Sequence, residues 1–588
     1  GVMAEGHREL PRSLVIKADE EHLLGSSPHR RMLHILTDKN GTLRFDAAPG
    51  EPLRVPPLSA GYYDCWLENA PGERSRLIVA PSACYIPSEL SGSQKRYGFA
   101  AHLYALRHEG DWGIGDFETL ARFGEASARA GGVVAGLNPM HILFPSDRHR
   151  VSPYQPSDRR FIDPIYIDLA GLLAEWPLPR ALQMANEQSR ALEELSAEPY
   201  VNYSGAWKLK AAILREVFTE FPGSADFESF VSKGGEEFYK HGLFEALASV
   251  FGIAEQRRWP ANSDLQRFAK DHREEIRFHL WLQWIAERQF ARAAERAAAA
   301  GLSIGFYRDF ALSTAFEGGE VWSNPECFAN GASLGAPPDP FARNGQIWNL
   351  PPQIPRALEQ RGFDPFISAI SANMRHAGAL RIDHILGYAR QFWIPQGASG
   401  GDGAYVKFPM DALIAVTAIE SHRHSCMVIG EDLGTVPEGL RQTLAAAHIL
   451  SYRVLWFERD GDEFRPPNAY PHLSTSCLGL HDLPTFIGWS RDAPVDEREA
   501  LVRAVRREGL EAGESEEDLL VAAHEFVARS GSTLMLVQLD DLYGETEPLN
   551  VPGTDRDRPN WRRRNRRNVE ELGSNARVIE AVKRGRNG

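Results

Sequence analysis

The chain has few cysteines and no cysteine pair of the metal-binding type, which argues against a disulfide-stabilised protein and against a structural zinc site. Its five cysteines are odd in number and widely scattered: Cys65, Cys84, Cys327, Cys426 and Cys477. Disulfide frameworks and structural zinc sites use closely spaced, paired cysteines. The pattern is instead typical of reduced thiols, and it predicts a cytoplasmic protein.

Long apolar runs and an excess of positive charge are also missing. No stretch of about 18 apolar residues occurs, so no membrane-spanning helix is predicted. The first residues lack a basic start followed by an apolar run, and we expect no signal peptide. The net charge of −14 disfavours nucleic acid and anionic membranes as partners, because both bind basic surfaces. A neutral partner such as a sugar is compatible with this charge.

No phosphate-binding glycine loop and no cluster of metal-ligating side chains stands out in the sequence. We therefore expect neither a cofactor nor a metal. The apolar fraction of 43% and the charged fraction of 24% are ordinary for a globular protein.

The length of 588 residues indicates two or more domains, or one large barrel with insertions. Residues 1–90 contain short apolar runs separated by Gly, Pro, Asn and Asp. This pattern predicts a small β-rich N-terminal domain. The remainder, residues 91–588, would form a larger second domain.

From residue 98 onward, eight apolar runs have the length of buried strands. They are Gly98–Leu106, Gly132–Met140, Ser303–Phe310, Ala379–Ile385, Met427–Asp432, Arg453–Glu458, Ser474–Asp482 and Thr533–Asp541. Helical patterns alternate with them, and Asp116 would cap a helix that reaches about Ala130. The predicted fold class is α/β, a (β/α)8 TIM barrel.

The spacing of the eight runs is uneven. About 160 residues separate the second run from the third, which is too many for a single connection. Helical patterns fill this interval, so we predict a helical insertion at about 141–300 and a second insertion at about 315–378.

Three carboxylates stand at the C-terminal ends of three predicted strands: Asp383, Glu431 and Asp482. They are about 50 residues apart, room for one or two strand–helix units, and such strand ends meet on one face of a barrel. Two carboxyl groups flanking one bond can break a glycosidic bond, one as an anionic nucleophile and one as a protonated acid. A single such residue more often caps a helix. Three together, with Arg381 and His481 beside them, favour a catalytic site.

Several longer motifs accompany these residues. They are Gly-Ala-Pro-Pro-Asp-Pro-Phe (335–341), Gly-Gln-Ile-Trp (345–348), Ser-Pro-Tyr-Gln (152–155), Asn-Val-Pro-Gly-Thr (550–554) and Pro-Asn-Trp-Arg-Arg (559–563). Together with the carboxylate motifs, they resemble those of the 4-alpha-glucanotransferases (amylomaltases or disproportionating enzymes), glycoside hydrolase family seventy-seven of the alpha-amylase clan. The resemblance extends from about Tyr97 to about Arg563.

The resemblance implies a retaining double displacement that transfers α-1,4-glucan segments between maltooligosaccharides or longer α-1,4-glucans. Asp383 would be the nucleophile, kept ionised by Arg381. Glu431 would be the general acid and base, which requires a raised pKa. Asp482 would stabilise the distorted sugar. The donor and the acceptor would both be α-glucans, and transfer in preference to hydrolysis is implied by the family alone.

The resemblance also implies a set of substrate-binding residues. They are Arg381, His384, His481, Tyr154, Gln155, Asp309, Asp339, Phe341, Gln346, Trp348, Asp432 and Asn550. Aromatic rings at Trp348 and Phe341 would offer faces to glucose rings. Asp309 departs from the family pattern in its neighbours Arg308 and Phe310, and structural capping competes with substrate binding at Asp432 and Asn550.

The basic run at 561–567 is interpreted as an exposed helix face or as internal ion pairs, in preference to a nucleic-acid site. Two other functions stay open. One is a hydrolase of the amylase clan, disfavoured by the 335–348 and 550–554 motifs. The other is a non-catalytic glucan-binding protein, disfavoured by the presence of all three carboxylates. The sequence does not predict the preferred chain length, the formation of cyclic glucans, the oligomeric state or the role of the N-terminal domain.

Overall fold

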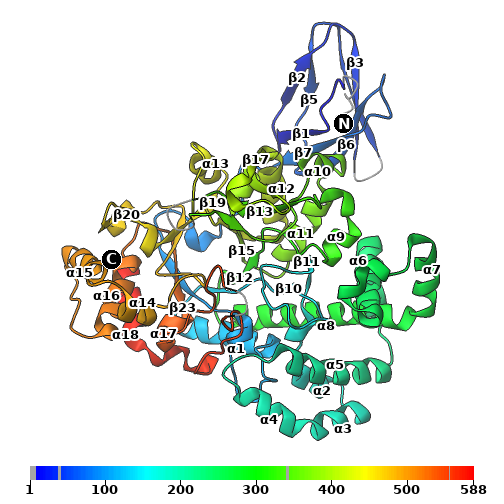
Figure 1. Cartoon of the computed structure of the whole chain (residues 1–588). Coiled ribbons are helices and arrows are strands. Elements are labelled where there is room, and N and C mark those ends of the chain that lie inside the picture. The colour runs from blue at the N-terminus through cyan, green and yellow to red at the C-terminus, as the bar shows by residue number, and fades with distance from the viewer. Residues whose placement is uncertain (1–7, 38–40, 339–342, 555–556, 588) are drawn as a thin grey trace.

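The computed structural model describes residues 8–37, 41–338, 343–554 and 557–587. Eight parallel strands close into a barrel at its centre, which confirms the predicted (β/α)8 fold (Figure 1). Around the barrel these strands are β12 (Gly305–Phe310), β15 (Ala379–Ile382), β18 (Met427–Gly430), β19 (Ile449–Val454), β22 (Ser474–Cys477), β23 (Leu534–Gln538), β8 (Arg96–Ala100) and β9 (Val134–Gly136).

Seven of the eight predicted strands contain the observed one or most of it, and most of them run on into the loop that follows. The prediction for the sixth, Arg453–Glu458, was wrong in its placement. Strand β19 covers Ile449–Val454, and Leu455–Phe457 form a short 3-10 helix. The strand follows helix α13 (Leu440–Ala446) after only two residues, Ala447 and His448, so no loop-length break announces its start.

Helix α1 (Phe117–Arg129) forms as predicted. The carboxylate of Asp116 accepts a hydrogen bond from the backbone N–H of Thr119 at 3.0 Å, and the Thr119 hydroxyl lies 3.1 Å from the backbone N–H of Asp116. This reciprocal cap satisfies donors that a helix start leaves unpaired. The helix ends before Gly131, whose φ of 91° suits glycine.

A helical layer fills the long interval between β9 and β12. It holds α2 (Leu169–Glu175), α3 (Pro179–Glu187), α4 (Ser189–Ala197), α5 (Tyr203–Glu220), α6 (Ala225–Phe251), α7 (Asn262–Asp271) and α8 (Arg273–Ala299), preceded by the pair β10 (His141–Ile142) and β11 (Asp158–Ile162). Because α8 packs along α1 as neighbouring barrel helices do, we propose that the insertion ends before α8 instead of at residue 300.

The predicted second insertion contains both helices and strands. Between β12 and β15 lie α9 (Gly319–Ser323), β13 (Ala332–Ala336), β14 (Gln346–Ile347), α10 (Pro355–Gln360) and α11 (Asp364–Met374). Strands β13 and β14 form a four-stranded sheet with β16 (Arg390–Pro395) and β17 (Ala404–Lys407), which follow β15. This sheet therefore joins two loops at the C-terminal face of the barrel.

The remaining elements complete the outer ring of the barrel. They are α12 (Met410–His424), the hairpin β20 (Arg459–Asp460) and β21 (Glu463–Phe464), α14 (Phe486–Asp492), α15 (Val495–Arg507), α16 (Glu516–Ala528), α17 (Leu539–Tyr543) and α18 (Ala576–Asn587). In the described part of the chain, no helix is both long and apolar enough to cross a membrane. All five cysteines are buried and free.

The N-terminal residues form the predicted β-rich unit, which stands out from the barrel in Figure 1. A five-stranded sheet has the order β1 (Ser13–Lys17), β7 (Ser75–Ala80), β6 (Gly61–Leu67), β3 (Arg31–Leu36), β4 (Thr42–Ala47), and β2 (His22–Ser26) pairs with β5 (Pro52–Val55). Strand β7 packs on α12 of the barrel.

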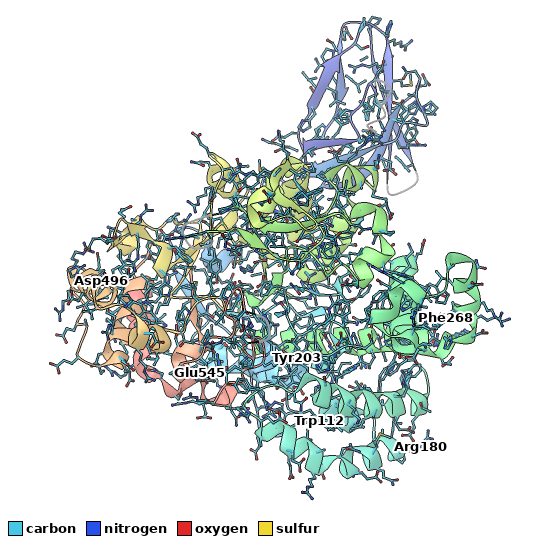
Figure 2. All side chains as sticks on the ribbon, in the orientation of Figure 1. Trp112, Arg180, Tyr203, Phe268, Asp496 and Glu545 are labelled. Carbon is cyan, nitrogen blue, oxygen red and sulfur yellow. The ribbon has the colours of Figure 1, made fainter. Side chains whose placement is uncertain are left out.

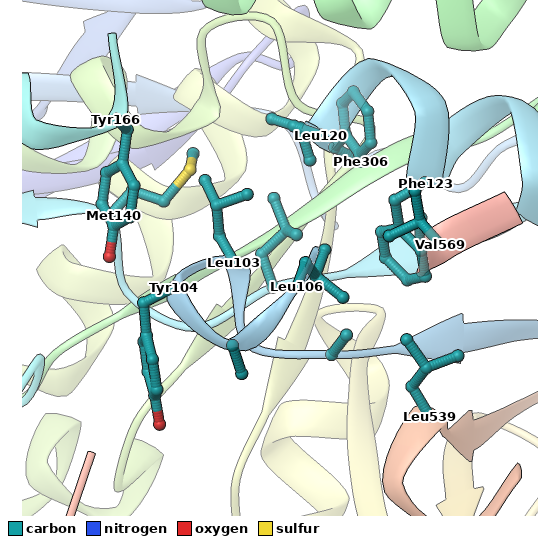
Figure 3. Packing of buried hydrophobic residues seen from close by; sticks show 14 of the residues in the cluster. Leu103, Tyr104, Leu106, Leu120, Phe123, Met140, Tyr166, Phe306, Leu539 and Val569 are labelled. Atoms are coloured by element: carbon teal, nitrogen blue, oxygen red, sulfur yellow. The ribbon is translucent and has the colours of Figure 1, made fainter. Parts of the chain in front are cut away.

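The main core joins distant parts of the barrel sequence (Figure 3). Leu103 near β8, Leu120 of α1, Phe306 of β12, Leu539 of α17 and Val569 near the C-terminus pack in one cluster with almost no exposed surface. Burial of each such side chain contributes roughly 1.5–3 kcal/mol. The barrel therefore closes through contacts between its first and last elements, which fixes the loops at its C-terminal face.

Candidate active site

The three predicted catalytic carboxylates all follow barrel strands. Asp383 comes directly after β15, Glu431 directly after β18, and Asp482 a few residues after β22. The backbone N–H of Asp383 donates to the Phe310 carbonyl, and that of Glu431 to the Ile382 carbonyl, each at 3.0 Å. These bonds extend the parallel ladder by one residue. Both carboxylates are consequently carried by rigid backbone and not by a free loop.

Glu431 is buried, and its carboxylate is held at both oxygens. The backbone N–H groups of His384 and Leu433 donate to it at 3.0 and 2.7 Å. Burial raises the pKa of Glu431 to about 7, with a further contribution from the negative charge of Asp383, while Arg381 acts in the opposite direction. A carboxyl group with this pKa can hold a proton near neutral pH and still release it.

His384 reaches Glu431 through an unusual backbone. Its φ of 47° lies in the left-handed region, which bulky residues seldom adopt. In this conformation its N–H points at the Glu431 carboxylate. Backbone of this kind persists where the surrounding structure holds it, and it is frequent at functional sites.

Arg381 lies between two carboxylates. Its Nη1 is 3.0 Å from Oδ1 of Asp383 and 2.8 Å from Oδ1 of Asp309, and its side chain is 5% exposed. Asp309 also accepts a 2.6 Å hydrogen bond from the Tyr154 hydroxyl. Burial raises the pKa of Asp309, although Arg381 opposes the shift. Asp309 thus acts on Asp383 through their common partner, Arg381.

His481 continues this network to the third carboxylate. Its ring stacks on Tyr154 at 4.8 Å between centroids, and its Nδ1 is 3.4 Å from the Tyr154 hydroxyl. Its Nε2 is 3.5 Å from Asp482, which also accepts a 2.6 Å hydrogen bond from the side-chain amide of Asn550. The polar contacts therefore run without a break from Asp383 to Asp482.

The short strand β14 leads directly into the aromatic residue that is expected to meet the sugar. Trp348 is half-buried and lies edge-on to His384 at 5.2 Å between ring centroids. Its indole N–H donates to Gln346, and its carbonyl accepts from the Gln155 side chain, both at 3.0 Å. Two of the predicted residues, Asp339 and Phe341, lie outside the described residues.

Asp432 is placed differently from its neighbour Glu431. It has no exposed surface, and it accepts hydrogen bonds from the Tyr452 backbone at 2.9 Å, the Ser451 hydroxyl at 2.6 Å and Arg441 at 2.8 Å. These partners occupy its oxygens, so the placement favours a structural role that joins β18 to β19 over the substrate contact predicted from the sequence.

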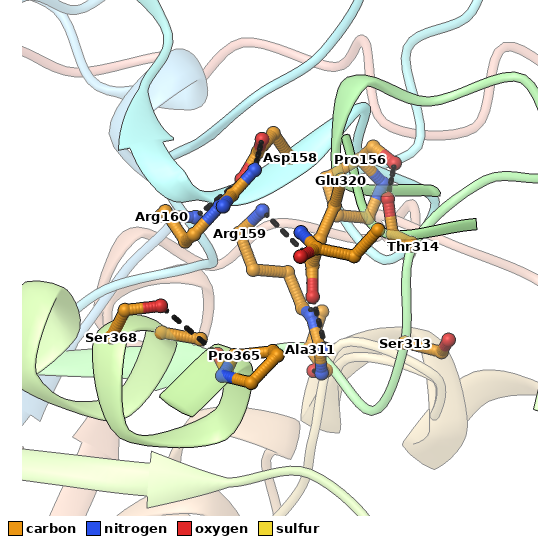
Figure 4. A network of polar contacts seen from close by, with 12 residues as sticks. Pro156, Asp158, Arg159, Arg160, Ala311, Ser313, Thr314, Glu320, Pro365 and Ser368 are labelled. Atoms are coloured by element: carbon orange, nitrogen blue, oxygen red, sulfur yellow. Dashed lines mark hydrogen bonds and ion pairs between the residues drawn. The ribbon is translucent and has the colours of Figure 1, made fainter. Parts of the chain in front are cut away.

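A second layer of polar contacts holds the segment that carries Tyr154 (Figure 4). Arg159 forms a buried pair with Glu320, with Nη2 and Oε1 at 2.6 Å, and also donates to the carbonyl of Ala311. The Thr314 hydroxyl donates to the Pro156 carbonyl at 2.7 Å. Because Ala311 and Thr314 follow β12, this layer fixes Tyr154 relative to Asp309.

Two aromatic side chains in the network were not predicted as site residues. His102 lies 5.3 Å from the His481 ring, and Trp561 lies 5.4 Å from it. Trp561 stands in the Pro-Asn-Trp-Arg-Arg motif, which was the available signal. His102 follows β8, the first barrel strand, and that position could have drawn attention to it. Burial lowers the pKa of His102 well below its usual value, so its ring is neutral at pH 7.

Comparison with known proteins shows which family this chain belongs to. The sequence profile described as 4-alpha-glucanotransferase matches residues 101–568, which include every residue of the site. A 4-alpha-glucanotransferase from Haemophilus influenzae is 33% identical over 594 residues, covering 91% of this chain and 85% of the relative. The chain belongs to the 4-alpha-glucanotransferase family.

Other members of the 4-alpha-glucanotransferase family support the assignment. One from Mycobacterium tuberculosis is 31% identical, covering 94% of this chain and 85% of the relative. The crystal structure of amylomaltase from Corynebacterium glutamicum superposes with a TM-score of 0.83 at 28% identity, over 98% of this chain and 90% of that one. An amylomaltase from Streptococcus agalactiae in complex with acarbose, at 20% identity and a TM-score of 0.70, shares the fold over 84% of this chain and 99% of that one.

Proposed function

We propose that this 4-alpha-glucanotransferase transfers α-1,4-glucan segments between maltooligosaccharides by a retaining double displacement. The observation that carries the proposal is a pair of carboxyl groups in different environments. Glu431 is buried, with its pKa raised to about 7, while Asp383 is paired with Arg381 at 3.0 Å. Such a difference suits one acid that holds a proton and one carboxylate that stays charged.

In the first step, a carboxylate oxygen of Asp383 attacks the anomeric carbon. The glycosidic C–O bond breaks, and Glu431 gives its proton to the departing oxygen. A covalent β-glucosyl ester on Asp383 remains. The positive charge that develops on the sugar ring would lie close to Asp383, while Asp482 would hold the ring hydroxyls in the distorted geometry.

In the second step, Glu431 accepts the proton of the 4-hydroxyl of another glucan while that oxygen attacks the anomeric carbon. The ester bond to Asp383 breaks, and the two inversions together restore the α configuration. Maltooligosaccharides and longer α-1,4-glucans would serve as donors and acceptors, and Trp348 would stack on a glucose ring of one of them. A cytoplasmic location remains a prediction from the free cysteines.

The test of this mechanism is covalent labelling. A maltosyl donor fluorinated on the reacting sugar should form the ester quickly and release it slowly, and peptide mapping by mass spectrometry should find the label on Asp383. A label on any other residue would refute the assignment. Asp383→Asn should form no label, because an amide is too weak a nucleophile to displace the leaving group.

A second measurement distinguishes transfer from hydrolysis. With maltotriose alone, transfer should yield glucose together with maltopentaose and longer chains. Hydrolysis should yield glucose and maltose without longer products. Chromatography of the products at early times separates the two outcomes, and products no longer than maltotriose would favour the clan hydrolase over the transferase.

A further inference from the structure

The ring of Trp561 joins the network behind the proposed sugar site. It lies parallel to the His102 ring at 5.9 Å, and 5.5 Å from the ring of Tyr154 and 5.4 Å from that of His481. It is 7% exposed. Tyr154 and His481 are the two residues that connect Asp309 to Asp482, so Trp561 packs directly on the connection.

The backbone of Trp561 is held in an unfavourable conformation. Its φ is 61°, in the left-handed region, where a bulky side chain is strained. Two hydrogen bonds fix it there: its N–H donates to the Leu549 carbonyl, and the Tyr203 hydroxyl donates to its own carbonyl, both at 2.9 Å. Strain of this kind persists only where neighbouring structure imposes it.

The basic run after Trp561 supplies that structure. Arg563 is buried and pairs with Asp540 at 2.7 Å and with Glu545 at 3.5 Å, and the buried Arg564 pairs with Asp111. Figure 2 labels Tyr203 and Glu545, which come from α5 and from the loop after α17. The segment that carries Trp561 is thereby anchored to both the helical insertion and the end of the barrel.

Leu549, which accepts the Trp561 N–H, is followed by Asn550, whose side-chain amide donates to Asp482. We propose that Trp561 is a positioning residue for the transfer reaction: its ring fixes the side chains of Tyr154 and His481 in the orientation that holds the reacting glucose. This inference rests on the proposed function and deepens it. Trp561 need not touch the sugar, since it acts through the two rings that it contacts.

The test compares three single variants in disproportionation of maltotriose. Trp561→Leu removes the aromatic ring, and Trp561→Phe keeps one. Trp281→Leu is the matched control, because Trp281 is fully buried in α8 and its ring packs on Trp176, Phe218 and Phe221 of the helical insertion. Each ring contact is worth about twofold to tenfold, so losing two should lower kcat/KM by about fourfold to hundredfold, mainly through kcat.

Trp561→Phe should keep kcat/KM within about threefold of the wild type, because the phenyl ring retains part of the contact with Tyr154 and His481. Trp281→Leu should lower the melting temperature while leaving kcat/KM nearly unchanged. Circular dichroism at the assay temperature verifies that each variant is folded. A folded Trp561→Leu with wild-type kcat/KM would overturn the proposal, and so would an equal kinetic loss in Trp281→Leu.

A double-mutant cycle measures the coupling between two residues in kcat/KM, which a general loss of stability does not change. In the Tyr154→Phe background, the further effect of Trp561→Phe on kcat/KM should be smaller than in the wild type, because both changes disturb one connection. Fully additive losses would overturn the proposal, even if Trp561→Leu does not fold. Absence of transfer by the wild-type enzyme would instead contradict the proposed function.

Discussion

The charge arrangement around Arg381 explains how two neighbouring carboxyl groups can behave differently. Arg381 contacts Asp383 and Asp309 through the same nitrogen, whereas the hydrogen bonds that Glu431 receives from the described residues come from backbone N–H groups. A full positive charge stabilises a carboxylate more strongly than neutral donors do. Of Asp383 and Glu431, Glu431 is therefore the group that better holds a proton near neutral pH.

This assignment predicts the pH dependence of the enzyme. The pKa of Glu431 is raised to about 7, and a general acid acts only in its protonated form. The kcat/KM for maltotriose should therefore fall as the pH rises above about 7, approaching tenfold per pH unit. The measurement is kcat/KM from pH 5 to 9 at constant ionic strength.

Glu431→Gln provides the control. It should have little activity on ordinary glucans, and a donor with a good leaving group, which needs no proton in the first step, should restore part of the rate of ester formation without the fall above pH 7. If this variant kept the alkaline fall on such a donor, another group would be responsible for it.

At the scale of single elements, two glutamine side chains hold Trp348, the residue that follows β14. Gln155 donates to the Trp348 carbonyl, and Gln346 accepts from the indole N–H. Trp348→Ala should raise KM for maltoheptaose about threefold to tenfold through lost stacking, with little change in kcat. Ile347→Ala is the matched control, since Ile347 is the exposed neighbour that ends β14. An unchanged KM in Trp348→Ala would show that the ring does not meet the sugar.

The basic run at the end of the barrel is a structural element. Arg564 is buried against Asp111, while Arg567 is exposed and donates to the Ser574 hydroxyl. Removing one partner of a buried ion pair costs about 3–5 kcal/mol. Arg564→Ala should therefore melt at a clearly lower temperature than the wild type, and Arg567→Ala should melt close to it. Similar melting temperatures for the two variants would mean that the buried pair contributes little.

Particular residues show which local features the sequence could and could not predict. The carboxylates that directly follow β15 and β18 could be predicted because each comes after a short apolar run. The family resemblance placed Asp432 among the substrate-binding residues, with structural capping as the alternative, yet successive residues of an extended chain point to opposite sides. The left-handed backbone of Trp561 has no signature in its side chain. The predicted sixth strand was placed too late in the sequence because residues 455–457 are apolar, as in a buried strand, whereas they form a 3-10 helix.

For the molecule as a whole, the barrel and the N-terminal β-rich unit were predictable because strands and helices alternate with recognisable periods. The connections between distant segments were not. Tyr154 meets Asp309 and His481 across 155 and 327 residues of sequence, and no local pattern encodes either contact. Sequence motifs thus supplied most members of the candidate site, although not His102 or Trp561, while the network that joins them required the fold.

The N-terminal unit gives the last prediction. Every residue of the site lies after Tyr97, so we propose that residues 1–90 are separable from the chemistry. Residues 1–90 nevertheless contribute to the stability of the folded chain. Ile78 of β7 is fully buried in a cluster with barrel residues of α11 and α12, and the Tyr62 hydroxyl donates to Glu420 at 2.8 Å.

A chain beginning at Ser91 should therefore disproportionate maltotriose with a kcat near that of the full chain. It should unfold at a lower temperature, because removal of residues 1–90 exposes the apolar face of α12. Full-length Tyr62→Phe is the control: it removes the hydrogen bond to Glu420 while keeping the apolar cover, so its melting temperature should fall much less. A truncated chain that is folded by circular dichroism yet inactive would show that residues 1–90 supply part of the site. Equal losses of stability in the two proteins would show instead that the polar contact, and not the apolar face, holds the unit to the barrel.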